Sequence, residues 1–319
     1  MELRILIVKV SSLGDIIHTL PAVTDAQKAH PGLTFDWVVE ENFVEVPSWH
    51  PAINKVIPVA IRRWRLNLFK TYLNREFLSF KKMLQGVHYD LVIDAQGLIK
   101  SGIISRLSKG LTVGLSNSTI KEPLASLFYN KAYSVSWEEH AVDRVRQLFS
   151  RALNYEYHQY PLDYGIKLEK DNVDDIEGKR NHIIFLHGTT RVSKYWPKEN
   201  WRYLAKLAAG YGYDVVLPWG TSEEKKRAEF IGEGNPNVKI LGKKSLSDLA
   251  TVIINSKGVI AVDTGLGHLA AALSKSTVSL YGPTNPALCG TYGRNQIHLK
   301  LENEPAVVWD KFEKLTNSL

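Results

Sequence analysis

The chain has 319 residues, of which 44% are hydrophobic and 23% charged, and its net charge is +7. A chain of this length is too long for a single hydrophobic core of ordinary size, so we expect two domains. The single cysteine, Cys289, excludes an intramolecular disulfide and any cysteine-based metal site, and it favours a reducing compartment. No apolar run is long enough to cross a bilayer, and the N-terminal run 5–8 is too short for a secretory signal, which predicts a soluble protein.

The positive charge is concentrated in residues 61–82, which contain seven basic residues against the single acid Glu76, a net charge of +6. A field of this sign attracts phosphates, carboxylates or an anionic membrane surface. Nucleic acid is a rival partner that composition alone does not reject, although the segment carries no recognised nucleic-acid-binding motif.

Runs rich in Val and Ile alternate along the chain with segments of helical period, a pattern typical of parallel sheets covered by helices. In the first half the predicted strands are 3–10, 34–40, 55–61, 91–96 and 112–115. The predicted helices are 15–30, 66–85, 98–109, 122–130 and 138–153.

The composition changes over 154–180, where tyrosines are followed by acidic residues, and this change marks the join between two domains. We expect an N-terminal domain over 1–160, a linker over 161–180 and a C-terminal domain over 181–319. In the second half the predicted strands are 182–187, 214–219, 238–241, 258–263 and 277–281, with helices after Pro197, Ser222, Ser245 and Gly265. A last helix over 306–317 could stay with the second domain or return to the first.

The predicted fold class is therefore α/β, with two doubly wound, Rossmann-like parallel sheets. Open sheets of this kind bind ligands at the carboxyl ends of their strands, so we expect the site in a central cleft lined by the loops that follow strands.

The segment 259–272 is a buried strand followed by a tight turn and a helix. Its turn contains Asp263, Thr264 and Gly265, and His268 lies in the first turn of the helix. Free N–H groups and the positive end of the helix dipole at such a turn bind anions. Ordinary helix capping, with His268 packed locally, explains the same pattern.

Two further loops of the second half carry polar residues. Thr189, Thr190 and Lys194 follow the first strand and could bind a diphosphate, or could belong to a solvated loop ahead of Pro197. Glu224 follows the second strand, where an acid can bind ribose hydroxyls, although acids are common in the first turn of a helix.

In the first half, Asp15 lies at the start of a helix after the first strand, in a turn without the G-x-G-x-x-G pattern. A carboxylate there could act as a general base, could cap the helix, or could do both.

Arg62, Arg63 and Arg65 follow the third predicted strand, in what we expect to be a loop ahead of the 66–85 helix. Arginine binds carboxylates and phosphates through two hydrogen bonds at once, which favours an acidic ligand. A solvated basic loop is the alternative.

These residues sit in blocks whose order and spacing are specific together: VKVSSLGD at 8–15, FDWVVE at 35–40, VAIRRWR at 59–65, IDAQGL at 93–98, KEPLASLFYN at 121–130, VDTGLGHL at 262–269 and YGPT at 281–284. The sequence resembles the ADP-heptose:lipopolysaccharide heptosyltransferases nearly end to end, with its closest likeness to the heptosyltransferase I branch.

The resemblance implies the GT-B fold, in which two Rossmann-like domains face a central cleft, and an inverting transfer that needs no metal or other cofactor. It implies that Asp15 is the general base. The residues implied to bind ADP-L-glycero-β-D-manno-heptose are Thr189, Thr190, Lys194, Glu224, Asp263, Thr264, Gly265 and His268. Lys244 falls beside the expected adenine, where the family often has methionine.

The implied acceptor is Kdo2-lipid A, where Kdo is 3-deoxy-D-manno-oct-2-ulosonic acid, bound in the N-terminal domain. Its expected contacts are Ser12, Arg62, Arg63, Arg65 and Lys121, with Arg144 or Arg146 in addition. Lys121 stands where close relatives have arginine, and Leu66 replaces a basic residue. This acceptor implies a cytoplasmic protein that is peripheral on the anionic inner membrane and has no nucleic-acid partner.

The alternatives are a heptosyltransferase II, which adds the second core heptose, and a regulatory protein that keeps the nucleotide site without catalysis. The 62–65 arginines and the 121–130 block favour the first transferase, and the presence of Asp15 favours catalysis.

Overall fold

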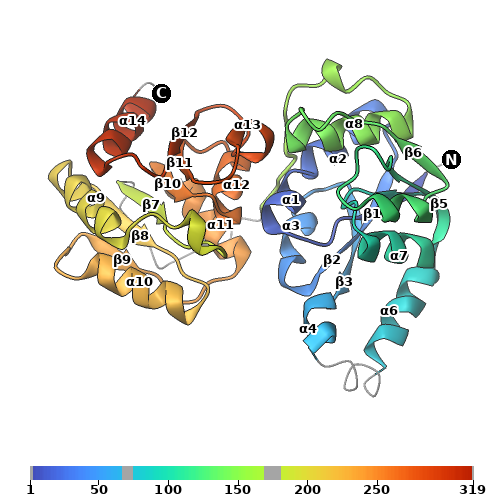
Figure 1. The fold of residues 1–319 in the computed structure, drawn as a ribbon, viewed down its shortest axis with the longest axis horizontal. Coiled ribbons are helices and arrows are strands. Elements are labelled where there is room, and N and C mark those ends of the chain that lie inside the picture. Colours follow the sequence, from blue (N-terminus) through green and yellow to red (C-terminus); the bar gives the residue numbers. More distant parts are fainter. Residues whose placement is uncertain (1–2, 67–74, 169–180, 318–319) are drawn as a thin grey trace. The chain divides into compact units, whose positions relative to one another are not determined.

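The computed structural model describes residues 3–66, 75–168 and 181–317. The chain divides into two compact units, Met1–Lys167 and Leu168–Leu319. Each unit is built on a six-stranded, all-parallel sheet with packed helices (Figure 1). Within the described residues, no helix combines the length and the apolar character that crossing a membrane would require.

The first unit has the strand order β3-β2-β1-β4-β5-β6. Its strands are β1 (Arg4–Val8), β2 (Thr34–Glu40), β3 (Ile53–Val59), β4 (His88–Asp94), β5 (Lys109–Leu115) and β6 (Lys131–Tyr133). Its described helices are α1 (Leu13–Ile17), α2 (Leu20–Ala29), α3 (Glu45–Ser48), α4 (Ile61–Leu66), α6 (Glu76–Gln85), α7 (Ile99–Leu107) and α8 (Ala141–Leu153), with short 3-10 helices at Glu41–Phe43, Pro123–Phe128 and Tyr157–Gln159.

The second unit has the strand order β12-β11-β10-β7-β8-β9. Its strands are β7 (His182–Leu186), β8 (Asp214–Leu217), β9 (Val238–Ile240), β10 (Gly258–Val262), β11 (Thr277–Tyr281) and β12 (Gln296–Lys300). Its helices are α9 (Lys198–Gly210), α10 (Ser222–Gly232), α11 (Leu246–Asn255), α12 (Gly265–Ala272), α13 (Pro286–Cys289) and α14 (Pro305–Asn317), with a 3-10 helix at Val192–Lys194.

Both sheets follow one topology. Counted within each unit, the strands run in the order 3-2-1-4-5-6, so the winding reverses between the first and fourth strands. The two reversal points lie between β1 and β4 and between β7 and β10. Ligands of open α/β sheets bind at the carboxyl ends of strands at this kind of switch point.

The central strands form because long apolar runs are stable only where helices cover both faces of a sheet. In β1, Ile5–Val8 are fully buried. All residues of β7 and β10 are buried as well. One face of the first sheet packs against Phe80 and Leu84 of α6 and Ile104 of α7. Elsewhere in the unit, α2 and α8 pack against each other (Figure 1).

Several predicted elements differ from the structure. The expected 15–30 helix is two helices, α1 and α2, with Pro21 at the second position of α2. The expected 122–130 helix is only a short 3-10 helix, Pro123–Phe128. Of the expected 66–85 helix, residues 67–74 lie outside the described residues, and α6 covers the last ten positions. The strands β6 and β12 were not predicted. The first has only three residues, and in the second polar residues alternate with the apolar ones.

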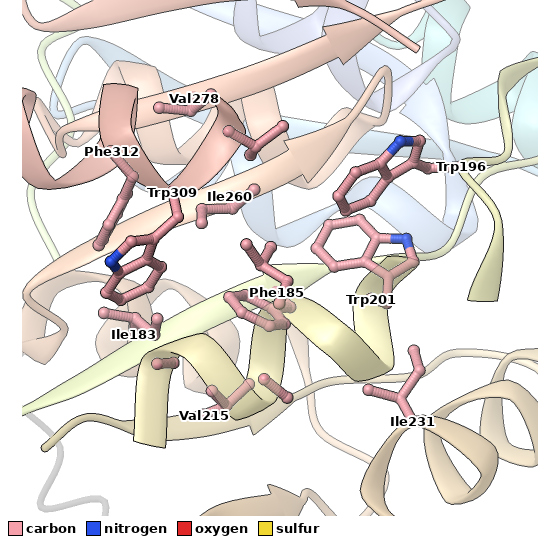
Figure 2. Close-up of a cluster of buried hydrophobic side chains, with 14 of the residues drawn as sticks. Ile183, Phe185, Trp196, Trp201, Val215, Ile231, Ile260, Val278, Trp309 and Phe312 are labelled. Carbon is pink, nitrogen blue, oxygen red and sulfur yellow. The ribbon is translucent and has the colours of Figure 1, made fainter. Parts of the chain in front are cut away.

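The last helix, α14, belongs to the core of the second unit. Val308, Trp309 and Phe312 pack with Ile183 and Ile260 of the sheet (Figure 2). The fit is close, because a Cβ added to Gly258 would lie 2.8 Å from the Phe312 ring. Of the two placements left open by the sequence, the structure has the one on the second unit.

We predict that Trp309→Ala lowers the free energy of unfolding by about 3–5 kcal/mol, because it leaves a cavity under α14. Urea denaturation followed by circular dichroism measures the loss. Tyr203→Ala on α9 is the control, because that ring is half exposed, and it should cost about 1 kcal/mol or less. Equal losses in the two variants would contradict the assignment of α14 to this core.

Candidate active site

Two loops are tied together at the switch point of the first sheet. The N–H groups of Val10 and Ser11, after β1, each donate to the side-chain oxygen of Gln96, after β4, at 3.0 Å. The Lys9 ammonium donates to the carbonyl oxygen of Ala95 at 2.8 Å. These bonds fix the path of the chain that leads into α1.

Asp15 lies in the first turn of α1. The N–H and the hydroxyl of Ser12 both donate to its Oδ2 atom, at 2.9 and 2.8 Å. Ser12 is the N-cap residue of α1 and Asp15 the third helical residue, so Asp15 takes part in capping the helix but is not itself the N-cap. The same bonds orient the carboxylate at the carboxyl edge of the sheet, which a general base also needs. Ser12, which is also a predicted acceptor contact, thus positions Asp15.

Lys9 is a buried cation beside this carboxylate, and sequence reasoning missed it. Burial lowers the pKa of Lys9, while the negative charges of Asp15 and Asp94 oppose that shift. The positive charges of Arg144 and Lys121 act on the same ammonium. The charges of Asp15, Lys121 and Arg144, predicted from separate segments, thus all act on one buried group. The available signal was a lysine directly after the apolar run 5–8.

Asp94 anchors the neighbouring loop. It ends β4 fully buried and accepts bonds from the N–H of Gln96 at 2.9 Å, the N–H of Gly97 at 3.1 Å and the Tyr129 hydroxyl at 2.8 Å. Burial raises the pKa of Asp94. The bond to Tyr129 holds the segment that contains Lys121 against the switch point.

The structure separates the roles of two arginines on α8. Arg146 is buried, pairs with Asp25 at 2.6 Å and donates to the carbonyl oxygen of Tyr160 at 2.7 Å. It holds α8 to α2 and is not placed for a ligand. Arg144 lies over the ring of Trp137, 3.5 Å from its centroid, and only partly buried. Of the two, Arg144 is the acceptor candidate.

The prediction of a loop for the basic cluster is wrong, because Arg62, Arg63 and Arg65 lie within helix α4. The Arg63 guanidinium binds Glu41 at 3.0 Å and Glu76 at 2.8 Å, and these two hydrogen-bonded pairs raise its pKa. Arg63 thereby fastens α4 to α6. The Arg62 guanidinium lies 5.5 Å from the centroid of the Phe43 ring, and Arg65 is exposed.

The switch point of the second sheet brings together three of the predicted residues. The Thr189 hydroxyl, after β7, donates to the carbonyl oxygen of Asp263, after β10, at 3.0 Å. The Lys194 ammonium pairs with the Asp263 carboxylate at 2.6 Å. Thr189 thus serves to join the loops, and Asp263 places the ammonium of Lys194 beside the start of α12.

Helix α12 begins directly at this point. Thr264 is its N-cap residue, in extended backbone conformation, and Gly265 is its first helical residue. His268 is buried in the first turn. N–H groups at the start of a helix attract anions, and here the Lys194 ammonium lies next to them. Thr190 is exposed on the neighbouring loop.

Glu224 reaches the same loop from α10. Its Oε2 atom accepts from the N–H groups of Gly220 at 2.7 Å and Thr221 at 3.1 Å, which caps α10. Its Oε1 atom lies so close to Gly188 that an added Cβ would come within 2.4 Å. Lys244, in the segment between β9 and α11, is partly exposed. Within residues 3–66, 75–168 and 181–317, no group of three or more His, Cys, Asp or Glu is arranged to hold a metal ion.

Comparison with known proteins gives consistent results. Residues 77–316 match the model of glycosyltransferase family 9 (heptosyltransferase). Lipopolysaccharide heptosyltransferase 1 of Pseudomonas aeruginosa is 52% identical over 298 residues, which cover 93% of this chain and 83% of that protein.

Two solved structures of Escherichia coli heptosyltransferase WaaC are each 45% identical and cover 98% of this chain. The structure with ADP has a TM-score of 0.91 and is covered completely, and the one with ADP-2-deoxy-2-fluoro heptose has a TM-score of 0.88 and is covered to 99%. These likenesses confirm the predicted fold class, two Rossmann-like parallel-sheet domains of the GT-B type.

We predict that Arg146→Met lowers the free energy of unfolding by about 3–5 kcal/mol, because it leaves the buried carboxylate of Asp25 without its partner. Arg144→Met, two residues away on the same helix, should cost about 1 kcal/mol or less. Urea denaturation of both variants tests the assignment. A larger loss for Arg144→Met would reverse the two roles.

Proposed function

Because the chain belongs to glycosyltransferase family 9, the heptosyltransferases, we propose that it transfers L-glycero-D-manno-heptose from ADP-heptose to the Kdo residue of Kdo2-lipid A. This is the heptosyltransferase I reaction of the lipopolysaccharide inner core. One observation carries the proposal: each sheet presents, at its switch point, the group that one half of this reaction needs. The first presents the oriented Asp15 carboxylate, and the second presents Lys194 beside the start of α12.

On the donor side, ADP must leave with the negative charge of its diphosphate. The Lys194 ammonium, paired with Asp263 at 2.6 Å, and the N–H groups at Thr264 and Gly265 would stabilise that charge. Residues of the neighbouring loops and helices complete the proposed donor site: Thr189, Thr190, Glu224, Lys244 and His268. Glu224 is suited to bind ribose hydroxyls, since its carboxylate lies against the β7 loop at Gly188.

On the acceptor side, Asp15 would remove the proton of the Kdo hydroxyl as the new bond forms at the anomeric carbon. Ser12 holds the carboxylate in place through two hydrogen bonds. The buried Lys9 fixes the loop through its bond to the carbonyl oxygen of Ala95, and its ammonium and the Asp15 carboxylate attract each other. The anionic groups of Kdo2-lipid A would meet the basic residues at this edge of the sheet: Arg62, Arg63, Arg65, Lys121 and Arg144.

We also propose that the protein acts without a metal ion and works on the cytoplasmic face of the inner membrane as a peripheral protein. Lys194 and the start of α12 already supply positive charge where other transferases use a cation. A membrane location follows from an acceptor carried by a lipid, and the net charge of +6 over residues 61–82 suits an anionic surface.

We predict that Asp15→Asn lowers the turnover number by about 10²–10⁴-fold, because the amide cannot accept the proton. The amide oxygen still accepts from Ser12, so the loop is kept and ADP-heptose binding should be nearly unchanged. Coupled ADP-release kinetics and calorimetry measure the two effects. Asp310→Asn, which removes an exposed pair with Lys314 on α14, is the control. Undiminished turnover in Asp15→Asn would exclude the base role.

Initial rates should be the same in excess EDTA and in added Mg²⁺, because protein groups stabilise the leaving diphosphate. The assay uses the purified enzyme after dialysis against chelator. Loss of turnover in EDTA that Mg²⁺ restores would overturn the metal-free proposal.

A further inference from the structure

The 3-10 helix Pro123–Phe128 presents two leucines to solvent. Leu124 is 62% exposed and Leu127 is 78% exposed, although both are large aliphatic side chains. Residues three apart in a 3-10 helix lie on the same side, so the two leucines project together. The helix is fixed from beneath, because Ala125 is fully buried and the Phe128 ring packs on Gly102 of α7.

Helix α7, against which this 3-10 helix packs, adds two more aliphatic side chains. Ile99 is 37% exposed and Ile103 is 44% exposed, and a spacing of four residues places them on one face of the helix. Exposed aliphatic side chains gathered on packed elements mark an interaction site. We call Ile99, Ile103, Leu124 and Leu127 the aliphatic patch.

The segment that carries the aliphatic patch is strongly basic. Residues 97–131 contain five basic residues against one acid, Glu122, for a net charge of +4; the basic residues are Lys100, Arg106, Lys109, Lys121 and Lys131. The Glu122 carboxylate accepts a hydrogen bond from the N–H of Ile99 at 2.7 Å.

We propose that the aliphatic patch is the surface by which the protein docks on an anionic phospholipid bilayer, with the leucines inserted at the headgroup boundary and the basic residues facing lipid phosphates. Exposed leucine and isoleucine in a segment rich in lysine are typical of interfacial membrane contacts. Protein interfaces are instead enriched in aromatic residues and arginine and depleted in lysine, so a second copy of the chain fits the patch less well.

The same segment is fastened to the candidate active site at both ends. The N–H of Glu122 donates to the carbonyl oxygen of Gly97 at 3.3 Å, and the Tyr129 hydroxyl donates to Asp94 at 2.8 Å. Lys121, one of the charges that act on Lys9, lies two residues before the 3-10 helix. Docking would therefore hold the lipid surface next to the Asp15 switch point. This inference rests on the proposed function, which supplies an acceptor borne by a lipid.

The test is co-sedimentation with vesicles of phosphatidylethanolamine and phosphatidylglycerol. The double variant Leu124→Ser/Leu127→Ser should bind at least about tenfold more weakly than the parent, because two large aliphatic side chains no longer leave water. The control Ile254→Ser/Val307→Ser removes two side chains of the second unit that are 42% and 41% exposed, and it should bind as the parent does. Circular dichroism verifies that both variants fold.

Activity separates this inference from the proposed function. The Leu124→Ser/Leu127→Ser variant should keep full turnover on a soluble, deacylated acceptor and lose it on acceptor embedded in vesicles. Equal vesicle binding by the variant and the parent would overturn the docking surface. A parent that is dimeric in sedimentation and becomes monomeric in the variant would also overturn it, and would give the patch to a second copy. If parent and variant both fail on the soluble acceptor, the proposed function fails, and the vesicle result still stands by itself.

Discussion

The constraint on which the rest of this structure depends is the order of strands in its two parallel sheets. Parallel strands bring all of their carboxyl ends to one edge, and the reversal between the first and fourth strands leaves an uncovered point there. The loops after β1 and β4 meet at that point in one unit, and the loops after β7 and β10 meet in the other. Hydrogen bonds of Lys9 and Gln96 join the first pair of loops. The hydrogen bond from Thr189 to the carbonyl oxygen of Asp263 joins the second pair.

The charges at the two points are arranged for different tasks. At the first, the buried Lys9 ammonium interacts with the Asp15 carboxylate and with the positive charges of Lys121 and Arg144, an arrangement that suits proton removal from an anionic acceptor. At the second, the ammonium of Lys194 is held by Asp263 beside the start of a helix, which suits a departing diphosphate. The chemistry that each unit can perform therefore agrees with membership in a glycosyltransferase family. In the proposed reaction neither task uses a metal ion.

Sequence reasoning succeeded where one local pattern decides the structure. Central strands such as β1 and β10 are unbroken apolar runs, and the turns after them carry the polar residues. It could not identify partners that lie far apart in the chain. Arg146 pairs with Asp25, which lies 121 positions away, and Arg63 pairs with Glu41 and Glu76. Lys9 directly follows the apolar run 5–8, but that run does not show that the carbonyl oxygen of Ala95, 86 positions away, binds its ammonium.

The most direct test of the account is mass spectrometry of the product formed from ADP-heptose and two soluble acceptors, the deacylated Kdo acceptor and the same acceptor already carrying one heptose. We predict the addition of a single heptose to the first acceptor, release of one ADP for each transfer, and no product from the second. Product from the heptosylated acceptor alone would make the protein a heptosyltransferase II, and no product from either would contradict the proposed transfer.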